Sequence, residues 1–211
     1  MDLVTKKTYK YMEYNKLHMY IWLLSFLIIG LSCRKQEVKS SCDPSSTSFQ
    51  SIFQNMTLNG HTDDVHYDTE IHEYTFVLSQ EEEVCELGYQ SQPAISSVPY
   101  LIEIIDNATS TIIYGGNHIF SSSETSFVIP PLTIALQAGI SYTLRRTILL
   151  NNANGQLGNI IGRVARKDQM NFPYSEGIMT VTDANFYQMN SPTGGSLQDV
   201  AVPYIDLVFR D

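Results

Sequence analysis

Short runs in which every second residue is apolar recur from residue 74 to the C-terminus, and this period of two restricts the fold most. In the clearest run, residues 98–106, the side chains of Val98, Tyr100, Ile102 and Ile104 share one face. Successive side chains of a strand point to opposite faces, so each run predicts a strand with one buried side. Further runs lie at residues 74–78, 85–89, 127–129, 142–144 and 205–209.

Turn-forming residues separate these runs, for example at 106–107, 115–117 and 154–155. Many short strands with few helical stretches are typical of antiparallel sheets that pack face to face. We therefore predict an all-β fold, a single antiparallel β-sandwich of Greek-key, immunoglobulin-like or jelly-roll-like type. Only residues 49–56 compete with this interpretation. Their apolar residues have the spacing of one helix face, with Ser48 as the cap, so a short helix is the alternative there.

Residues 136–142, LQAGISY, resemble the tyrosine corner of Greek-key sandwiches. In that motif a tyrosine hydroxyl at the start of a strand bonds to the backbone just upstream. The resemblance makes Tyr142 the corner tyrosine, with Ala138 at the position of the usual proline; a plain strand tyrosine is the alternative. Residues 72–150 also resemble uncharacterised β-sandwich modules of exported bacterial proteins, often attached to carbohydrate-active or surface-layer chains. That resemblance implies a binding or structural module and transfers no catalytic residues.

An apolar run of thirteen residues, 19–31, follows four lysines near the N-terminus. It is shorter than the ~20 residues of a membrane-spanning helix, but it matches the apolar core of a signal peptide. The run ends in Gly30-Leu31-Ser32-Cys33, which resembles the lipobox of bacterial lipoproteins. This implies cleavage before Cys33 and acylation of Cys33, palmitate included, in the envelope of a Gram-negative bacterium, with the outer membrane as the expected location. A cysteine that merely follows an ordinary signal peptide is the alternative.

The chain therefore divides into a lipoprotein signal peptide (1–32), a serine-rich flexible tether (33–48) and the β-sandwich domain (49–211). Cys42 and Cys85 remain once Cys33 is acylated. An even pair of cysteines in an oxidising compartment favours a disulfide. Cys85 also alternates with Leu87 and Tyr89 on an apolar face, where a free buried thiol is common, so both states of the pair stay open.

Charge is distributed unevenly along the chain. No Lys or Arg lies between Lys39 and Arg145, a stretch with thirteen Asp or Glu, and the formal net charge of the whole chain is −9. This acidity argues against a nucleic-acid partner. In the densest acidic part, Asp63, Asp64 and Asp68 are oxygen ligands that suit a structural Ca²⁺ if they converge in a loop. A solvated acidic loop without a metal is the alternative, and no other cofactor is expected.

No nucleophile elbow, phosphate-binding glycine loop or zinc-protease motif occurs in the sequence, so we expect no enzymatic activity. Glycan-binding sandwiches place aromatic faces against sugar C–H groups and polar side chains against the hydroxyls. Two loop-like aromatic segments fit that pattern and supply the candidate ligand-binding residues, with turn and packing roles as the alternative. These residues are Tyr114, Asn117, His118, Phe172 and Tyr174.

We accordingly expect a lipid-anchored, non-catalytic module of the cell envelope or cell surface. The membrane is its first partner through the N-terminal acyl chains, and the sandwich is presented to a glycan or protein ligand by its end loops. The alternative function is that of a structural envelope or assembly protein, which contacts neighbouring subunits through sheet edges or faces.

Overall fold

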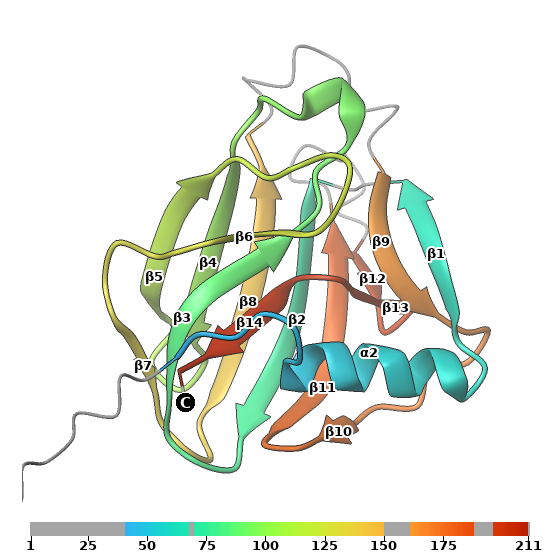
Figure 1. Cartoon of the computed structure of the whole chain (residues 1–211). Coiled ribbons are helices and arrows are strands. Elements are labelled where there is room, and N and C mark those ends of the chain that lie inside the picture. Colours follow the sequence, from blue (N-terminus) through green and yellow to red (C-terminus); the bar gives the residue numbers. More distant parts are fainter. Residues whose placement is uncertain (1–40, 68–69, 150–160, 188–195, 211) are drawn as a thin grey trace, which may run out of the picture. The chain divides into compact units, whose positions relative to one another are not determined.

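The computed structural model describes residues 41–67, 70–149, 161–187 and 196–210. The predicted signal peptide, Cys33 and most of the tether lie outside these residues. Residues 40–211 form one compact unit, and within it the described strands build three antiparallel sheets (Figure 1). The fold is the predicted all-β sandwich, and one α-helix accompanies the sheets in the described part of the chain.

The largest sheet has the strand order β10-β11-β2-β8-β4-β5, and β12 also pairs with β11. Each neighbour along this order is antiparallel. Its strands are β2 (Ile71–Leu78), β4 (Tyr100–Asp106), β5 (Thr111–His118), β8 (Ser141–Ile148), β10 (Tyr174–Glu176), β11 (Met179–Tyr187) and β12 (Ser196–Gln198).

A smaller sheet packs against it and has the order β14-β3-β6, with β7 also on β3; a third sheet has the order β1-β9-β13. A 3₁₀ turn, η1 (Pro93–Ile95), lies between β3 and β4. The remaining strands are β1 (Thr62–Tyr67), β3 (Glu82–Tyr89), β6 (Ser126–Val128), β7 (Ile134–Leu136), β9 (Ile161–Arg166), β13 (Ala201–Pro203) and β14 (Asp206–Phe209).

The core forms where the apolar faces of the two larger sheets meet. In β4, Tyr100, Ile102 and Ile104 are buried and the residues between them are more exposed, which is the alternation predicted for residues 98–106. These side chains join one continuous apolar cluster with Leu87 of β3 and Leu144 of β8. Burying one face of each sheet removes apolar surface from water and provides most of the driving force for this packing.

One fully buried cation lies inside this core. The Arg146 side chain of β8 has no exposed surface, and its guanidinium carbon lies 5.4 Å from the ring centroid of Tyr89 and 5.6 Å from that of Tyr100. Its Nη1 also donates to the carbonyl oxygen of Glu70 at 3.3 Å. The negative faces of the two rings and the carbonyl oxygen stabilise a charge that would be costly to bury alone.

On the opposite, polar face of the large sheet, carboxylates are paired across strands. Arg145 Nε donates to Glu73 Oε2 at 2.6 Å, and the Tyr187 hydroxyl donates to the same oxygen at 2.9 Å. Glu103 of β4 lies 3.9 Å from Arg145 on its other side. The first arginine after the acidic stretch therefore balances carboxylates from two neighbouring strands.

The helix left open by the sequence forms as α2 (Ser48–Leu58), and it buries Phe49, Ile52, Phe53 and Met56. Ser48 was predicted to cap it, and this is wrong by one residue. Thr47 caps the helix, because its hydroxyl oxygen accepts a hydrogen bond from the backbone N–H of Gln50 at 2.9 Å, a donor that has no partner within the first helical turn.

Asp206 of β14 holds the start of α2 against the smaller sheet. The Thr47 hydroxyl donates to Asp206 Oδ1 and Gln50 Nε2 donates to Asp206 Oδ2, both at 2.7 Å. Asp206 is completely buried. Burial raises the pKa of this carboxyl to about 6, although the hydrogen bonds from Thr47 and Gln50 act in the opposite direction.

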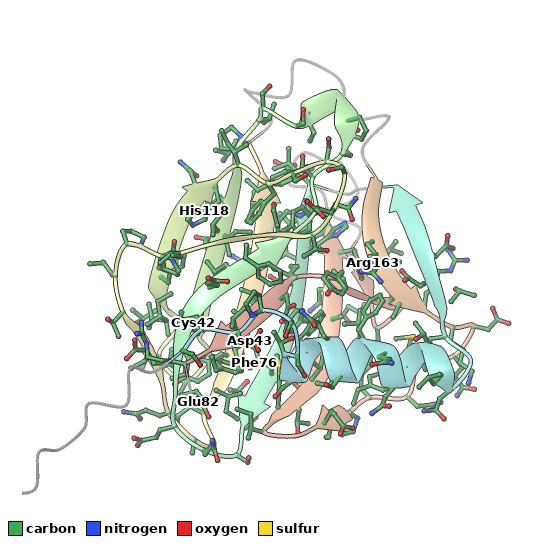
Figure 2. The ribbon with its side chains drawn as sticks, viewed as in Figure 1. Cys42, Asp43, Phe76, Glu82, His118 and Arg163 are labelled. Carbon is green, nitrogen blue, oxygen red and sulfur yellow. A yellow bond between two sulfur atoms is a disulfide. The ribbon has the colours of Figure 1, made fainter. Side chains whose placement is uncertain are left out.

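The segment before the helix also belongs to the body. Cys42 lies beside β3 in Figure 2, and a disulfide joins it to Cys85 of that strand. The Cys42 backbone also forms a β-bridge with the backbone of Arg210. Gln50 Nε2 donates to the Pro44 carbonyl oxygen at 2.8 Å. Residues 42–48, which we assigned to the flexible tether, therefore pack on the sandwich, and the domain begins before the predicted boundary at residue 49.

The segment that resembles a tyrosine corner has the backbone contact typical of that motif. Tyr142 is buried, and its hydroxyl oxygen accepts a hydrogen bond from the Gln137 backbone N–H at 2.9 Å. Gly139 lies between them with a φ of 74°, a left-handed conformation that favours glycine. The Gly139 N–H donates to the Leu78 carbonyl at 2.9 Å, which ties this turn to the end of β2.

Candidate functional site

The structure places the two predicted aromatic segments at opposite edges of the large sheet. Tyr114, Asn117 and His118 lie on β5, at one end of the strand order. Tyr174 begins β10, at the other end, and Phe172 precedes it. The five candidate residues therefore do not form one site, and each group has its own surroundings.

The β5 group is a strand and not the predicted loop, because Gly115, Gly116 and Asn117 all pair with β4. The Tyr114 hydroxyl lies 2.6 Å from His118 Nε2, and the two rings are nearly parallel with centroids 6.1 Å apart. Burial raises the pKa of Tyr114 and lowers that of His118, so the hydroxyl donates and the neutral imidazole accepts. His118 (Figure 2) also faces the ring of Phe120 at 6.1 Å.

The absence of a β-carbon at Gly116 allows the Tyr114 and His118 rings to approach each other. A β-carbon at that position would lie 2.5 Å from the Tyr114 hydroxyl and 2.8 Å from His118 Nε2. Tyr114 is buried and its polar tip is bonded to His118. The ring therefore packs within the protein and offers no exposed aromatic face for a sugar.

The second aromatic group borders a groove between α2 and β10, which we call the α2–β10 groove. Its volume is about 510 Å³, within the range of ~300–1,000 Å³ that is usual for small-molecule sites. The lining residues come from the helix, from the turn after it and from the segment that enters β10. They are Ile52, Asn55, Met56, Asn59, His61, Asn171, Pro173, Tyr174 and Ser175.

A chain of hydrogen bonds fixes Tyr174 at this groove. His61 Nδ1 lies 2.8 Å from the Met56 carbonyl oxygen, which can only accept, so Nδ1 carries the proton. His61 Nε2 then accepts from the Tyr174 hydroxyl at 3.0 Å. The backbone N–H of Asn171 donates to the same hydroxyl oxygen at 2.8 Å. Phe172 packs edge-on against the Tyr174 ring, with 5.1 Å between centroids, so the aromatic platform is held on two sides.

Amide side chains supply the polar part of the groove. Asn55 and Asn59 lie one helical turn apart, and Asn59 Nδ2 donates to the Asn55 carbonyl oxygen at 2.8 Å. Asn55 Nδ2 donates to Glu176 on β10, which joins the two walls. An amide group offers both donors and an acceptor, as sugar hydroxyls require. The groove thus combines a fixed aromatic ring with neutral polar groups, an arrangement suited to a neutral polyhydroxylated ligand.

The acidic segment has a different arrangement from the predicted calcium loop. Asp63 and Asp64 lie in β1 and so point to opposite faces. Arg163 of β9 donates to both carboxylate oxygens of Asp63, at 2.9 and 2.7 Å, and Arg166 lies 3.8 Å from Asp64. Asp68 lies outside the described residues, and within the described ranges no group of three His, Cys, Asp or Glu is placed to hold a metal ion. The calcium site stays a prediction.

Sequence reasoning found Tyr174 and Phe172 but missed the other wall of the groove. The spacing of four between Asn55 and Asn59 places both on one face of a helix, and this signal was present in the sequence. His61 lies just before the acidic residues Asp63 and Asp64 in the sequence and is not among the predicted ligand-binding residues. Nothing local indicated that it would meet a tyrosine more than a hundred residues away.

A scan against protein-family models and a search of curated proteins find no match to this chain. Among the described residues, no helix is both long enough and apolar enough to cross a membrane.

Proposed function

We propose that the chain is a lipid-anchored, non-catalytic module of a bacterial cell envelope that binds carbohydrate in the α2–β10 groove. The observation that carries the ligand assignment is the Tyr174 ring, which is held by His61 and Asn171 beside the amides of the groove. The observation that carries the anchor is the lipobox-like end of the apolar leader, Gly30 to Cys33.

A fixed ring is an efficient platform for a sugar. Its face packs against the apolar C–H groups of a pyranose. The Tyr174 side chain loses no rotamer freedom on binding, because its hydroxyl is already hydrogen-bonded to His61 and to the Asn171 backbone. The side-chain amides of Asn55, Asn59 and Asn171 then form hydrogen bonds with the hydroxyl groups of the sugar. An acidic polysaccharide is disfavoured, because residues 40–211 carry nineteen Asp or Glu against six Lys or Arg.

The module acts by presenting this groove away from the membrane. Acyl chains on Cys33 hold the N-terminus in the bilayer, since two chains suffice for stable anchoring. The segment between Cys33 and Cys42 supplies the reach, and the Cys42–Cys85 disulfide sets where the tether joins the sandwich. The Gram-negative outer membrane is the proposed site, and no chemical step is part of the function.

A glycan array probed with the purified chain tests the ligand assignment. We expect binding to neutral sugars, a loss of at least tenfold in affinity for Tyr174→Ala, and a smaller loss for Tyr174→Phe, which keeps the ring. Asn117→Ala, at the opposite edge of the sheet, is the matched control and should bind as the unmodified chain does. An array without bound sugars, or unchanged binding by Tyr174→Ala, would exclude the groove as a carbohydrate site.

The anchor has its own test in the expressing cell. Cys33→Ala should abolish acylation, shift gel mobility and release the protein from the membrane fraction. If mobility and membrane association stay unchanged, the lipoprotein assignment is wrong, whereas the carbohydrate site would still stand on its own test.

An envelope or assembly protein remains the second candidate function. One observation favours it: β5, an edge strand, exposes the isoleucines Ile112 and Ile113. Natural proteins usually protect such edge strands against pairing with another chain. This function predicts that β5 contacts another protein.

A further inference from the structure

In the described part of the chain, two edge strands have six or more residues. They are β1 and β5. β5 pairs with β4 on one side, and no described strand pairs with its other side. Figure 1 shows it as the outermost strand at the left of the large sheet. An edge strand presents backbone N–H and C=O groups that match those of an added strand.

The two edges differ in the side chains that protect them. β1 carries Asp63 and Asp64, and charges of this kind discourage pairing with another chain. β5 has no Asp, Glu, Lys or Arg from Thr111 to His118. Ile113 is 39% exposed within the strand and Ile119 is 58% exposed just after it, so apolar side chains are available at both ends of a neutral stretch.

The geometry of β5 limits the part that can accept a strand. Tyr114 lies opposite Ile104 and Ile112 lies opposite Ile105, which leaves Ile113 as the extra residue of a bulge. Bulges bend an edge and interrupt regular pairing. The regular stretch is therefore 114–118, and the Tyr114–His118 hydrogen bond holds its inner face on the core. This stretch is already paired with β4 before any partner arrives, which lowers the entropic cost of pairing.

We propose that the β5 edge pairs with an extended segment of a partner protein. The part of this segment that pairs is uncharged and apolar at alternate positions, and Lys or Arg residues flank it. Backbone hydrogen bonds to residues 114–118 provide the affinity. The flanking cations follow from the charge of the body, in which acidic residues outnumber basic ones by nineteen to six over residues 40–211. A second copy of this chain would bring like charges together and is disfavoured. The proposal does not depend on the carbohydrate site, which lies at the opposite edge.

Synthetic strand peptides test this proposal on the purified chain. The probe is a fluorescent peptide of alternating Ile and Thr between flanking lysines; one comparison peptide has flanking glutamates and another has a central proline. Fluorescence anisotropy measures affinity, and amide hydrogen exchange maps the contact. We expect the lysine-flanked peptide to bind at least tenfold more tightly than either comparison peptide and to slow exchange within residues 114–118.

A pair of double variants separates the edge from general electrostatics. Ile113→Lys with Ile119→Lys should weaken binding of the lysine-flanked peptide at least tenfold. Leu58→Lys with Leu197→Lys adds the same charge at two other exposed apolar positions and should change affinity less than threefold. Since all four side chains are exposed, neither variant should prevent folding.

Three results would overturn the proposal. They are no binding of the lysine-flanked peptide, equal binding of the proline peptide, and equal loss in both double variants. A dimer in sedimentation equilibrium that disappears in the Ile113→Lys, Ile119→Lys variant would assign the edge to a second copy and overturn the choice of partner.

Discussion

Asp206 should make the stability of the sandwich fall as the pH rises from about 4 to about 7. The carboxyl is buried with no exposed surface and its pKa is raised to about 6 from an ordinary value of 3.8. The folded state therefore binds this proton more tightly than the unfolded state does. The resulting stabilisation is fully present below the unfolded pKa and is lost as the pH rises through the folded pKa.

The magnitude follows from the difference between the two pKa values. A shift of about 2 units corresponds to ~3 kcal/mol, at 1.36 kcal/mol per unit. Asp206→Asn removes the titration and leaves a neutral side chain of the same shape. Its amide would face the donating Gln50 Nε2, and the lost hydrogen bond costs ~1 kcal/mol at every pH. The variant should thus be ~1 kcal/mol less stable than the unmodified chain at pH 4 and ~2 kcal/mol more stable at pH 7.

Urea unfolding followed by far-ultraviolet circular dichroism at pH 4, 5, 6 and 7 measures this difference. Asp168→Asn, at an exposed aspartate, is the control and should show no comparable change of the difference with pH. If the difference between Asp206→Asn and the unmodified chain is constant over this range, the carboxyl is not perturbed as described and the reasoning fails.

Three other variants test the main structural contacts, each by urea unfolding at neutral pH. Replacing Cys42 and Cys85 together by serine should lower the free energy of unfolding by ~4 kcal/mol, because the disulfide closes a loop with a sequence separation of 43; an unchanged value in non-reducing buffer would contradict the bridge. Tyr142→Phe should cost ~1 kcal/mol by leaving the Gln137 N–H without its acceptor, and a neutral effect would contradict the corner. Gly116→Ala should cost ~1–3 kcal/mol, because its β-carbon would clash with the ring pair above it; full stability would show that those rings are loosely held.

The strand character of the chain was predictable because it depends on local periodicity. The alternation in residues 98–106 appears directly as the buried face of β4. The turn at Asp106 and Asn107 was also correctly located, and the Asp106 carboxylate accepts from the backbone N–H of Ala108 at 2.8 Å there. Such signals need no knowledge of the partner strand, since the side chains of any strand alternate.

The segment 115–117 shows where local reasoning fails. Two glycines and an asparagine are typical of a turn, yet they lie in the middle of β5. Pairing with β4 decides this conformation, and the small size of Gly116 serves the packing of Tyr114 against His118 instead of a reversal of the chain. The preference of a residue for a turn is weak compared with several inter-strand hydrogen bonds.

The sequence by itself determined that this chain would build antiparallel sheets around an apolar face. Its N-terminal leader also predicted a location in the bacterial cell envelope. Only the tertiary structure decided which side chains meet. His61 reaches Tyr174 and Thr47 reaches Asp206 across more than a hundred residues, and the two aromatic segments separate to opposite edges of one sheet. The physical reason is that alternation of side chains is a property of a single strand, whereas strand order depends on the free energy of the whole packed body.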